Sequence, residues 1–238
     1  ADEFYRLVEK LQPSVPLVLH LDHTRTLSVI EEAIAAGFTS VMIDASEYGL
    51  EENMRITGEV VRMAHPGNVT VEGELGRIGT TDFVETDHNE VVFTDPDEAA
   101  LFAEQTGVDA LAISVGTAHG LYTGMNPRID MEIISAINAR TAVPLVLHGG
   151  SGVSDTAIAQ AVSLEEGGVS KVNIASELEK AMLDSLGRSG HMTEQELLAV
   201  SPQELRQARA AVAALVVWKI QHALGSAGAA VSFSGNSA

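Results

Sequence analysis

The segment TDPDEAALFAEQTGVDALAISVGTAHG (94–120) contains one complete unit of the predicted fold. Residues 95–106 follow a helical pattern that opens at Asp95-Pro96, a typical helix start. Residues 109–115 (DALAISV) form a short apolar run of the kind found in buried strands. The run leads into Gly116-Thr117-Ala118-His119-Gly120, where glycine and polar groups gather. A helix followed by such a strand is the repeating unit of α/β proteins.

The same unit recurs along almost the whole chain. Strand-like runs occupy 16–22, 38–44, 69–75, 109–115, 144–148 and 169–174, and helical patterns at 26–36, 51–64, 95–106, 130–139 and 154–163 separate them. This alternation predicts parallel strands joined by crossover helices. With 238 residues and no shift in composition, we expect one (β/α) barrel domain over 1–238. A helix near 176–186, a polar linker over 187–201 and a long helix over 202–224 predict a C-terminal helical extension at about 187–238.

Composition limits both the chemistry and the partners. The chain has no cysteine, so a metal ion would have to be held by His, Asp or Glu. The formal net charge of −19 would repel a nucleic acid or an anionic membrane surface. No apolar run reaches the roughly 20 residues that a membrane span requires, and the N-terminal stretch does not resemble a signal peptide. We therefore expect a cytoplasmic protein without nucleic-acid or membrane partners.

Polar residues collect on the inner faces of the predicted strands, toward their carboxyl ends. Side chains alternate along a strand, and helices are expected to cover Leu17, Leu19 and Leu21. That places His20 and Asp22 on the inner face. The same alternation turns inward Met42 and Asp44, Glu72 and Glu74, Val146 and His148, and Lys171 and Asn173. Barrels and open α/β sheets carry their active sites at the carboxyl ends of the strands, so these residues predict an active site there.

Three histidine-containing segments lie at these strand ends. They are His20-Leu21-Asp22-His23, Gly116-Thr117-Ala118-His119-Gly120 and His148-Gly149-Gly150-Ser151-Gly152. Three imidazoles with an open fourth position form a catalytic zinc site. The neighbouring glycines would let the backbone approach a ligand and direct N–H groups at a phosphate. The competing interpretation of each histidine is a hydrogen-bonded core residue, and it is strongest for His20.

Seven longer segments carry a resemblance to a known family. They are LHLDH (19–23), GFTSVMIDAS (37–46), VEGELGRIG (71–79), TDPDEAALFAEQTGVDALAISVGTAHG (94–120), PLVLHGGSGVSD (144–155), KVNIASEL (171–178) and GSAGAA (225–230). In this order they resemble the class II fructose- and tagatose-bisphosphate aldolases over nearly the whole chain. The resemblance implies a (β/α)8 TIM barrel, glycolysis or related carbohydrate metabolism, and a homo-oligomer, dimer or tetramer. It also implies reversible cleavage of a ketose 1,6-bisphosphate to dihydroxyacetone phosphate and an aldehyde such as glyceraldehyde 3-phosphate.

The resemblance also assigns roles residue by residue. His23, His119 and His148 match the zinc ligands, and Asp22 matches the acid/base that moves a proton at the aldehyde-side hydroxyl. Positions that bind dihydroxyacetone phosphate through backbone groups and short side chains match Gly120, Gly149, Gly150, Ser151, Asn173, Ile174, Ala175 and Ser176. Asp44 and Glu74 match positions that in some relatives hold a second divalent or monovalent cation. The alternative for this pair is a buried hydrogen-bonded couple.

The sequence departs from the family pattern at three places. The family's chain opens with a β-α-β segment, and six strands cannot close an eight-stranded barrel. Either an N-terminal segment of about 50–60 residues is absent from this sequence, which we favour, or the sheet is open. In relatives the loop after Glu74 often carries Gly-X-Glu-Asp, with Glu as a proposed proton abstractor. Here it reads Gly79-Thr80-Thr81-Asp82-Phe83, so Asp82 or Glu85 would substitute, or both are solvated loop acids. Ser176 stands where threonine is usual and keeps the hydroxyl.

Two other functions stay open from the sequence. Lys171, one of four lysines, lies on an inner strand face and would suit a Schiff-base aldolase, although that mechanism leaves three histidines without a role. A catalytically silent sugar-phosphate-binding homologue would fit the altered loop. We also expect loops 77–93 and 117–128 to be mobile without ligand. Phosphate is expected near Gly149, Ser151, Asn173 and Ser176 through backbone N–H groups, because no basic residue except Lys171 is close in sequence.

Overall fold

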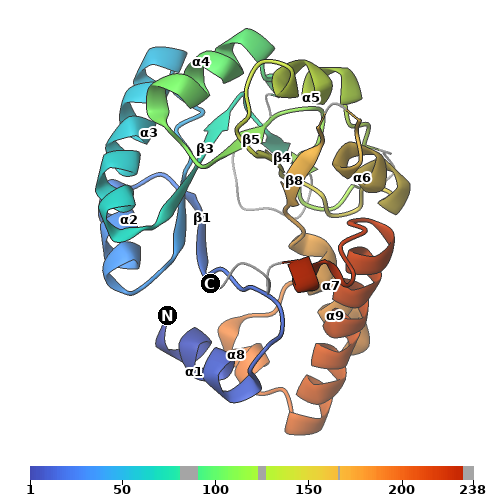
Figure 1. The fold of residues 1–238 in the computed structure, drawn as a ribbon. Helices are drawn as coiled ribbons and strands as arrows, with labels where there is room; N and C mark the ends of the chain where they lie inside the picture. The colour runs from blue at the N-terminus through green and yellow to red at the C-terminus, as the bar shows by residue number, and fades with distance from the viewer. Residues whose placement is uncertain (81–90, 123–126, 166, 233–238) are drawn as a thin grey trace.

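Six parallel strands form the sheet at the centre of the protein. The computed structural model describes residues 1–80, 91–122, 127–165 and 167–232. Within these ranges the strand order is β1-β2-β3-β5-β7-β8, and every pairing is parallel. The strands are β1 (His20–Thr24), β2 (Ser40–Ile43), β3 (Thr70–Leu75), β5 (Ala110–Ile113), β7 (Leu145–Leu147) and β8 (Val169–Val172). Their spatial order follows the chain, and the sheet curls into a half-barrel (Figure 1).

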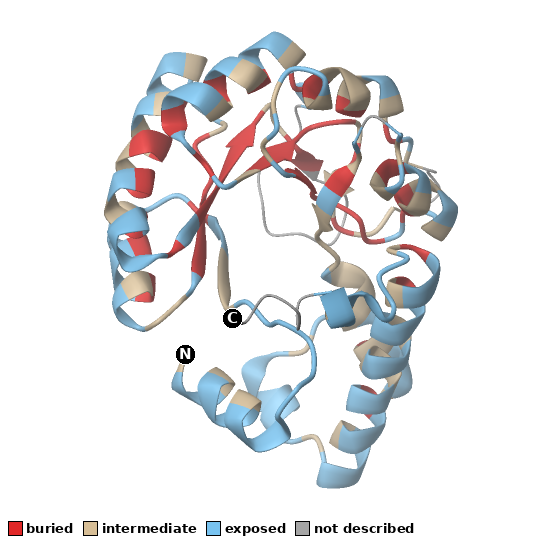
Figure 2. Cartoon of the chain, in the orientation of Figure 1, coloured by how far each residue is buried: buried red, intermediate tan, exposed pale blue. Residues whose placement is uncertain are grey.

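Five helices cover the outer side of the curled sheet (Figure 1). They are α2 (Leu27–Ala35), α3 (Leu50–Ala64), α4 (Pro96–Thr106), α5 (Met131–Asn138) and α6 (Asp155–Val162). Several begin at a side-chain cap, as where the Asp95 carboxylate accepts the N–H groups of Asp97 and Glu98. Their apolar faces bury Ile30, Phe102 and Ile134 completely against the strands. The buried residues of Figure 2 accordingly follow the strands and the inward faces of these helices.

The inner face of the sheet carries a second, smaller apolar cluster. Met42, Ala112 and Val146 pack together there, separate from the main core. Strand alternation therefore turns Met42 and Val146 inward, as predicted, while Ile43 and Leu147 belong to the outer core. Polar side chains occupy the rest of the inner face toward the carboxyl ends of the strands.

The remaining helices gather on the other side of the molecule. Helix α9 (Pro202–His222) packs against α7 (Ser176–Ser185) and α6, and α1 (Asp2–Leu11) and α8 (Glu194–Leu198) complete this group (Figure 1). The predicted helix over 202–224 agrees with α9. The predicted polar linker is partly wrong, because Thr193 and Glu196 form a capping box that starts α8. Two short 3₁₀ helices lie at His65–Gly67 and Ala229–Ser232. In the described part of the chain, no helix is long and apolar enough to cross a membrane.

The first predicted strand needs the largest correction. The other strands begin and end within two residues of their predicted bounds, but β1 starts at His20 and residues 16–19 lie outside it. Its partner β2 begins at Ser40, just after the turn at Gly37 (φ 92°), so residues 16–18 extend beyond the end of that strand. Leu17 is 49% exposed, and the expectation that helices cover it was wrong.

The closed barrel of eight strands stays a prediction. Among the described residues, β1 pairs with β2 alone and β8 with β7 alone in this sheet. A further two-stranded parallel sheet joins β4 (Gly79–Thr80) to β6 (Ala118–His119), and the sequence did not indicate it. This small sheet lies near the carboxyl ends of the main strands and carries one of the predicted metal ligands.

Candidate metal centre

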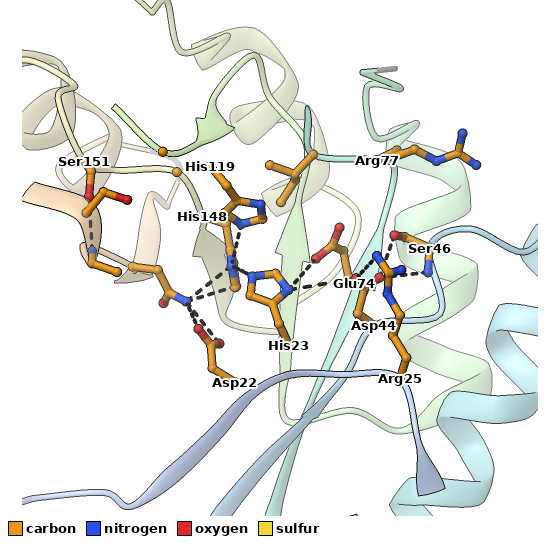
Figure 3. Close-up of a pocket in the computed structure, with 16 residues that line it drawn as sticks. Asp22, His23, Arg25, Asp44, Ser46, Glu74, Arg77, His119, His148 and Ser151 are labelled. Atoms are coloured by element: carbon orange, nitrogen blue, oxygen red, sulfur yellow. Dashed lines mark hydrogen bonds and ion pairs between the residues drawn. The ribbon is translucent and has the colours of Figure 1, made fainter. Parts of the chain in front are cut away.

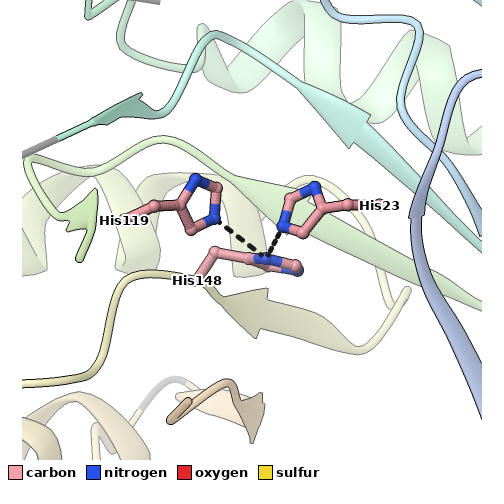
Figure 4. Close-up of side chains that lie close together, drawn as sticks. All are labelled: His23, His119 and His148. Atoms are coloured by element: carbon pink, nitrogen blue, oxygen red, sulfur yellow. Dashed lines mark hydrogen bonds between the residues drawn. The ribbon is translucent and has the colours of Figure 1, made fainter. Parts of the chain in front are cut away.

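Three histidine side chains meet at the carboxyl ends of the strands (Figure 4). His23 Nε2 lies 2.7 Å from His148 Nδ1, and His119 Nε2 lies 3.4 Å from the same atom. One nitrogen from each ring falls within 4.8 Å of the others. His148 is fully buried, whereas His23 and His119 are partly reached by solvent. A cation between the three rings would therefore be open on one side.

A bulge in β1 aims His23 into this cluster. The pairing of β1 with β2 shifts register between Leu21 and Thr24, and His23 has a positive φ of 43°. In an unbroken strand His23 would share the face of Leu21, which packs on the main core. The bulge reverses that direction, as bulges next to active sites commonly do. Positive φ is unusual for histidine, so the surrounding contacts must hold the backbone there.

His119 is held beside His148 by a close backbone approach. Gly149 has φ 67°, and a Cβ on it would lie 2.3 Å from the Ala118 carbonyl oxygen. The Tyr122 hydroxyl ties the same two loops together, because it lies 2.9 Å from the Ala118 oxygen and 3.2 Å from the Gly149 oxygen. Glycine at 149 is thus required by both backbone angle and space.

A buried carboxylate fixes the orientation of His148. Glu72 Oε1 lies 2.8 Å from His148 Nε2, and Glu72 Oε2 lies 2.7 Å from Lys171 Nζ. A carboxylate accepts hydrogen bonds, so Nε2 carries the proton and the lone pair of Nδ1 faces the cluster. Lys171 Nζ is also 3.4 Å from His20 Nε2. His20 and Lys171 therefore belong to a network behind His148, and neither is among the described residues that line the cavity.

The cluster is electrically suited to a cation. Burial and the neighbouring imidazoles of His23 and His148 lower the pKa of His119 to about 3. Burial and the neighbouring imidazole of His148 also lower the pKa of His23. Both rings are consequently neutral at neutral pH, and a neutral imidazole offers the lone pair that a metal binds.

Asp22 lies beside the cluster with its carboxylate toward the cavity (Figure 3). Each of its oxygens accepts a 3.2 Å hydrogen bond from Asn173 Nδ2. Burial opposes ionisation, but the hydrogen bond from His20 and the positive charge of Lys171 help to hold the pKa of Asp22 well below its usual value. The group is ionised at neutral pH and is placed to accept a proton.

Two further carboxylates, those of Asp44 and Glu74, lie on the other side of His23 from the cluster. Asp44 Oδ2 and Glu74 Oε2 each lie 3.9 Å from His23 Nδ1. Asp44 accepts hydrogen bonds from Ser46, and Arg25 Nη2 is 3.4 Å away. Burial resists its charge, but these contacts lower the pKa of Asp44. Glu74 Oε2 is buried without a hydrogen-bond partner among the described residues, and burial together with the Asp44 charge raises the pKa of Glu74 well above its usual value.

These side chains line one cavity of about 250 Å³ (Figure 3). His23, His119 and His148 lie near its middle. At one end stand the glycine-rich loop and the start of α7, with Gly120, Gly149, Ser151, Asn173, Ala175 and Ser176 in the lining. Gly150 and Ile174 are outside this lining in the described part of the chain. Gly150 instead packs on the end of β8, where its N–H donates to the Asn173 oxygen at 3.0 Å.

The other end of the cavity contains residues that sequence reasoning missed. Arg25, Ser46 and Arg77 line it, together with Ile78 (Figure 3). Arg25 and Arg77 follow His23 and Glu74 by two and three residues, and that proximity was the available signal. The expectation of few basic side chains concerned the phosphate site at the opposite end of the cavity, and it stays a prediction. Asp82 and Glu85, the predicted substitutes for the proton abstractor, lie outside the described residues, as does most of the loop expected to be mobile.

Comparison with known proteins gives matches over most of the chain. The family model described as fructose-bisphosphate aldolase class-II matches residues 1–229. YdjI of Escherichia coli K12, described as an uncharacterized protein, is 42% identical over 170 residues, which is 71% of this chain and 60% of that protein. The matched region thus spans less than two thirds of that relative.

Solved structures show the same fold. The crystal structure of the YdjI aldolase from E. coli K12 superposes with a TM-score of 0.77 at 36% identity, covering 96% of this chain and 77% of that one. The fructose-bisphosphate aldolase of Campylobacter jejuni gives a TM-score of 0.68 at 25% identity, covering 93% and 74%. The half-barrel of parallel strands is therefore shared with these aldolase structures.

Proposed function

Because this chain belongs to the class II fructose-bisphosphate aldolase family, we propose that it is a metal-dependent lyase. Its reaction would be the reversible cleavage of a ketose 1,6-bisphosphate of the fructose or tagatose type. The products would be dihydroxyacetone phosphate and an aldehyde such as glyceraldehyde 3-phosphate. One observation carries the proposal: three imidazole nitrogens converge within 4.8 Å beside an ionised carboxylate in a cavity.

The residues present fit a zinc ion. His23 and His119 would offer Nε2 and His148 would offer Nδ1, and neutral imidazoles are the ligands that zinc prefers in such three-histidine sites. Glu72 keeps the proton of His148 on the other nitrogen. The ion, when bound, would act as a Lewis acid that stabilises the negative charge developing next to the ketone.

Asp22 would move the proton at the aldehyde-side hydroxyl. In the cleavage direction that hydroxyl must lose its proton as the carbon–carbon bond breaks, and the ionised carboxylate accepts it. In the condensation direction the same group returns the proton to the new oxygen. Asn173 holds both carboxylate oxygens from one side, so Asp22 keeps a defined direction toward the cavity.

The glycine-rich loop and the start of α7 would hold the phosphate of dihydroxyacetone phosphate. Ser151 joins the two segments, since its Oγ accepts the N–H groups of Ala175 at 3.1 Å and Glu177 at 3.2 Å. Backbone N–H groups at a helix start favour an anion. Gly120, Gly149 and Ser176 stand around this end of the cavity. Gly150 would act indirectly, by seating the loop on β8.

A second cation site at Asp44 and Glu74 has less direct support than the three-histidine site. The Glu74 oxygen that has no hydrogen-bond partner among the described residues and the carboxylate of Asp44 would bind a divalent or monovalent cation next to His23. Arg25 already compensates Asp44. The hydrogen-bonded alternative is a protonated Glu74 beside an ionised Asp44, which the opposite directions of their pKa shifts support.

Zinc analysis and turnover test the proposal together. Purified protein should contain about one zinc per chain and cleave at least one of fructose and tagatose 1,6-bisphosphate. EDTA should abolish turnover, and added zinc should restore it. Borohydride in the presence of substrate should leave the chain unmodified, because Lys171 is paired with Glu72 behind His148. Trapping of an adduct on Lys171 would establish the Schiff-base alternative.

The same experiment also tests the alternative that the chain is a catalytically silent sugar-phosphate-binding homologue. Zinc and phosphate binding without cleavage of either ketose bisphosphate would favour it. Cytoplasmic location, a homo-oligomer and a closed (β/α)8 barrel are predictions that accompany the proposed function.

A further inference from the structure

Lys219 is a buried cation that the proposed reaction does not use. It belongs to α9, far from the cavity residues in sequence, and is 6% exposed. Its Nζ lies 2.8 Å from Asp155 Oδ1 and 3.0 Å from Glu177 Oε2. A buried lysine with two carboxylates is uncommon, because burial opposes its charge. These two carboxylates nevertheless raise the pKa of Lys219 above its usual value.

The two carboxylates stand at the starts of two helices that flank the glycine-rich loop. Asp155 is the first residue of α6, and Glu177 is the second residue of α7. Glu177 Oε2 also accepts the Gly152 N–H at 3.2 Å. Asp155 Oδ2 accepts the indole N–H of Trp218 at 2.7 Å, so α9 contacts α6 through two neighbouring side chains.

We propose that Lys219 is a positioning residue for the phosphate-binding loop, an inference that rests on the proposed function. It connects α9 to α6 and α7 and, through Glu177, to the loop at Gly152. Ser151, next in the loop, is itself bonded to the Ala175 and Glu177 N–H groups. The ion pairs thus hold the loop against the start of α7, at the end of the cavity where the phosphate is expected to bind.

Lys219 also reduces the negative charge near the expected phosphate site. Asp155 and Glu177 would otherwise present two negative charges close to a bound phosphate in a chain whose net charge is already −19. Lys219 offsets one of these two charges from a position where water screens its charge weakly. The ion cluster of Lys219, Asp155 and Glu177 therefore carries a net charge of −1 instead of −2.

Phosphate binding and steady-state kinetics of Lys219→Met test this role. The methionine side chain keeps most of the length and removes the charge. We expect about tenfold weaker binding of inorganic phosphate and about tenfold higher KM for the ketose bisphosphate, with kcat changed less than about twofold and zinc content unchanged. Lys219→Arg should recover most of the affinity. Lys180→Met is the matched control, because Lys180 lies on α7 in an exposed pair with Asp184 and should behave as the wild type.

The possible outcomes separate this inference from the proposed function. If Lys219→Met binds phosphate as the wild type does, Lys219 has no positioning role, while the aldolase proposal stands. If kcat, zinc content and phosphate affinity all fall together, the residue supports the fold in general and the inference is overturned. If the wild type binds no phosphate at this site, the proposed function fails first. Should Lys219→Met not fold, Glu177→Ala decides by the same readouts, since it removes the side-chain contacts with Gly152 and Lys219 and leaves the Asp155 pair.

Discussion

Replacing Glu72 with glutamine tests the metal centre without altering an imidazole. Glu72 is 2% exposed, and its oxygens lie 2.8 Å from His148 Nε2 and 2.7 Å from Lys171 Nζ. Glutamine has nearly the same shape, but its amide offers one acceptor and one donor group in place of two acceptors. Lys171 loses its counter-charge in either orientation of the amide. Since both neighbours are donors, one of them faces the amide NH2 group, and where this is His148 the imidazole also loses the acceptor that keeps its proton on Nε2. The network that directs Nδ1 of His148 at the cluster is therefore weakened.

The expected magnitude follows from the position of Glu72 behind a metal ligand. Removing such an outer partner weakens metal binding by about 10- to 100-fold. That is about 1.4 to 2.8 kcal/mol of binding free energy. The Lys171 side chain is 36% exposed, so water partly replaces its lost partner and the effect on folding should be smaller. We therefore expect a folded variant whose zinc dissociation constant is raised and whose secondary structure is unchanged.

Competition with a zinc-binding dye gives the dissociation constant directly. Glu52→Gln is the matched control, since Glu52 pairs with Arg55 at 2.8 Å on the exposed side of α3 and should leave zinc binding unchanged. Zinc affinity of Glu72→Gln within about twofold of the wild type would refute the reasoning, because His148 would then need no support from Glu72 or would not be a ligand. An equal loss in the control would show that the effect is not specific to the site.

Three further predictions concern neighbouring residues. Asp22→Ala should lower kcat by about 10²- to 10⁴-fold with zinc content unchanged; loss of zinc as well would make Asp22 a support of the metal. Gly149→Ala should lower zinc affinity and the melting temperature, because φ is 67° and a Cβ would lie 2.3 Å from the Ala118 oxygen; a variant with wild-type values would contradict the close approach. In the metal-free protein, stability should fall as pH drops below 6.5, since the pKa of His119 is lowered from 6.5 to about 3 and the unfolded chain binds the extra proton between these values. The loss of unfolding free energy amounts to about 1 kcal/mol between pH 7.5 and 5.5. Chemical denaturation at these two pH values should show a smaller loss in His119→Asn.

Local patterns in the sequence were enough to predict the elements of the fold. The alternation of apolar runs and helical patterns predicted the six main strands, and the Asp95-Pro96 start predicted α4. Strand alternation also turned Met42 and Val146 inward, because side-chain direction in a regular strand depends only on neighbouring residues. The same rule failed at the amino end of β1, where strand pairing stops because the partner strand begins later.

The site itself was decided by contacts between distant segments. His23 points into the cluster only because β1 bulges against β2, which reverses the direction that alternation would give it. Glu72 and His148 are 76 residues apart in the chain, and their hydrogen bond follows from the arrangement of the strands. Lys219 pairs with Asp155 and Glu177 from a helix that the sequence placed in a C-terminal extension. Periodicity determines which way a side chain faces along its own element, whereas the partner it meets depends on how separate elements pack, and only the tertiary structure contains that information.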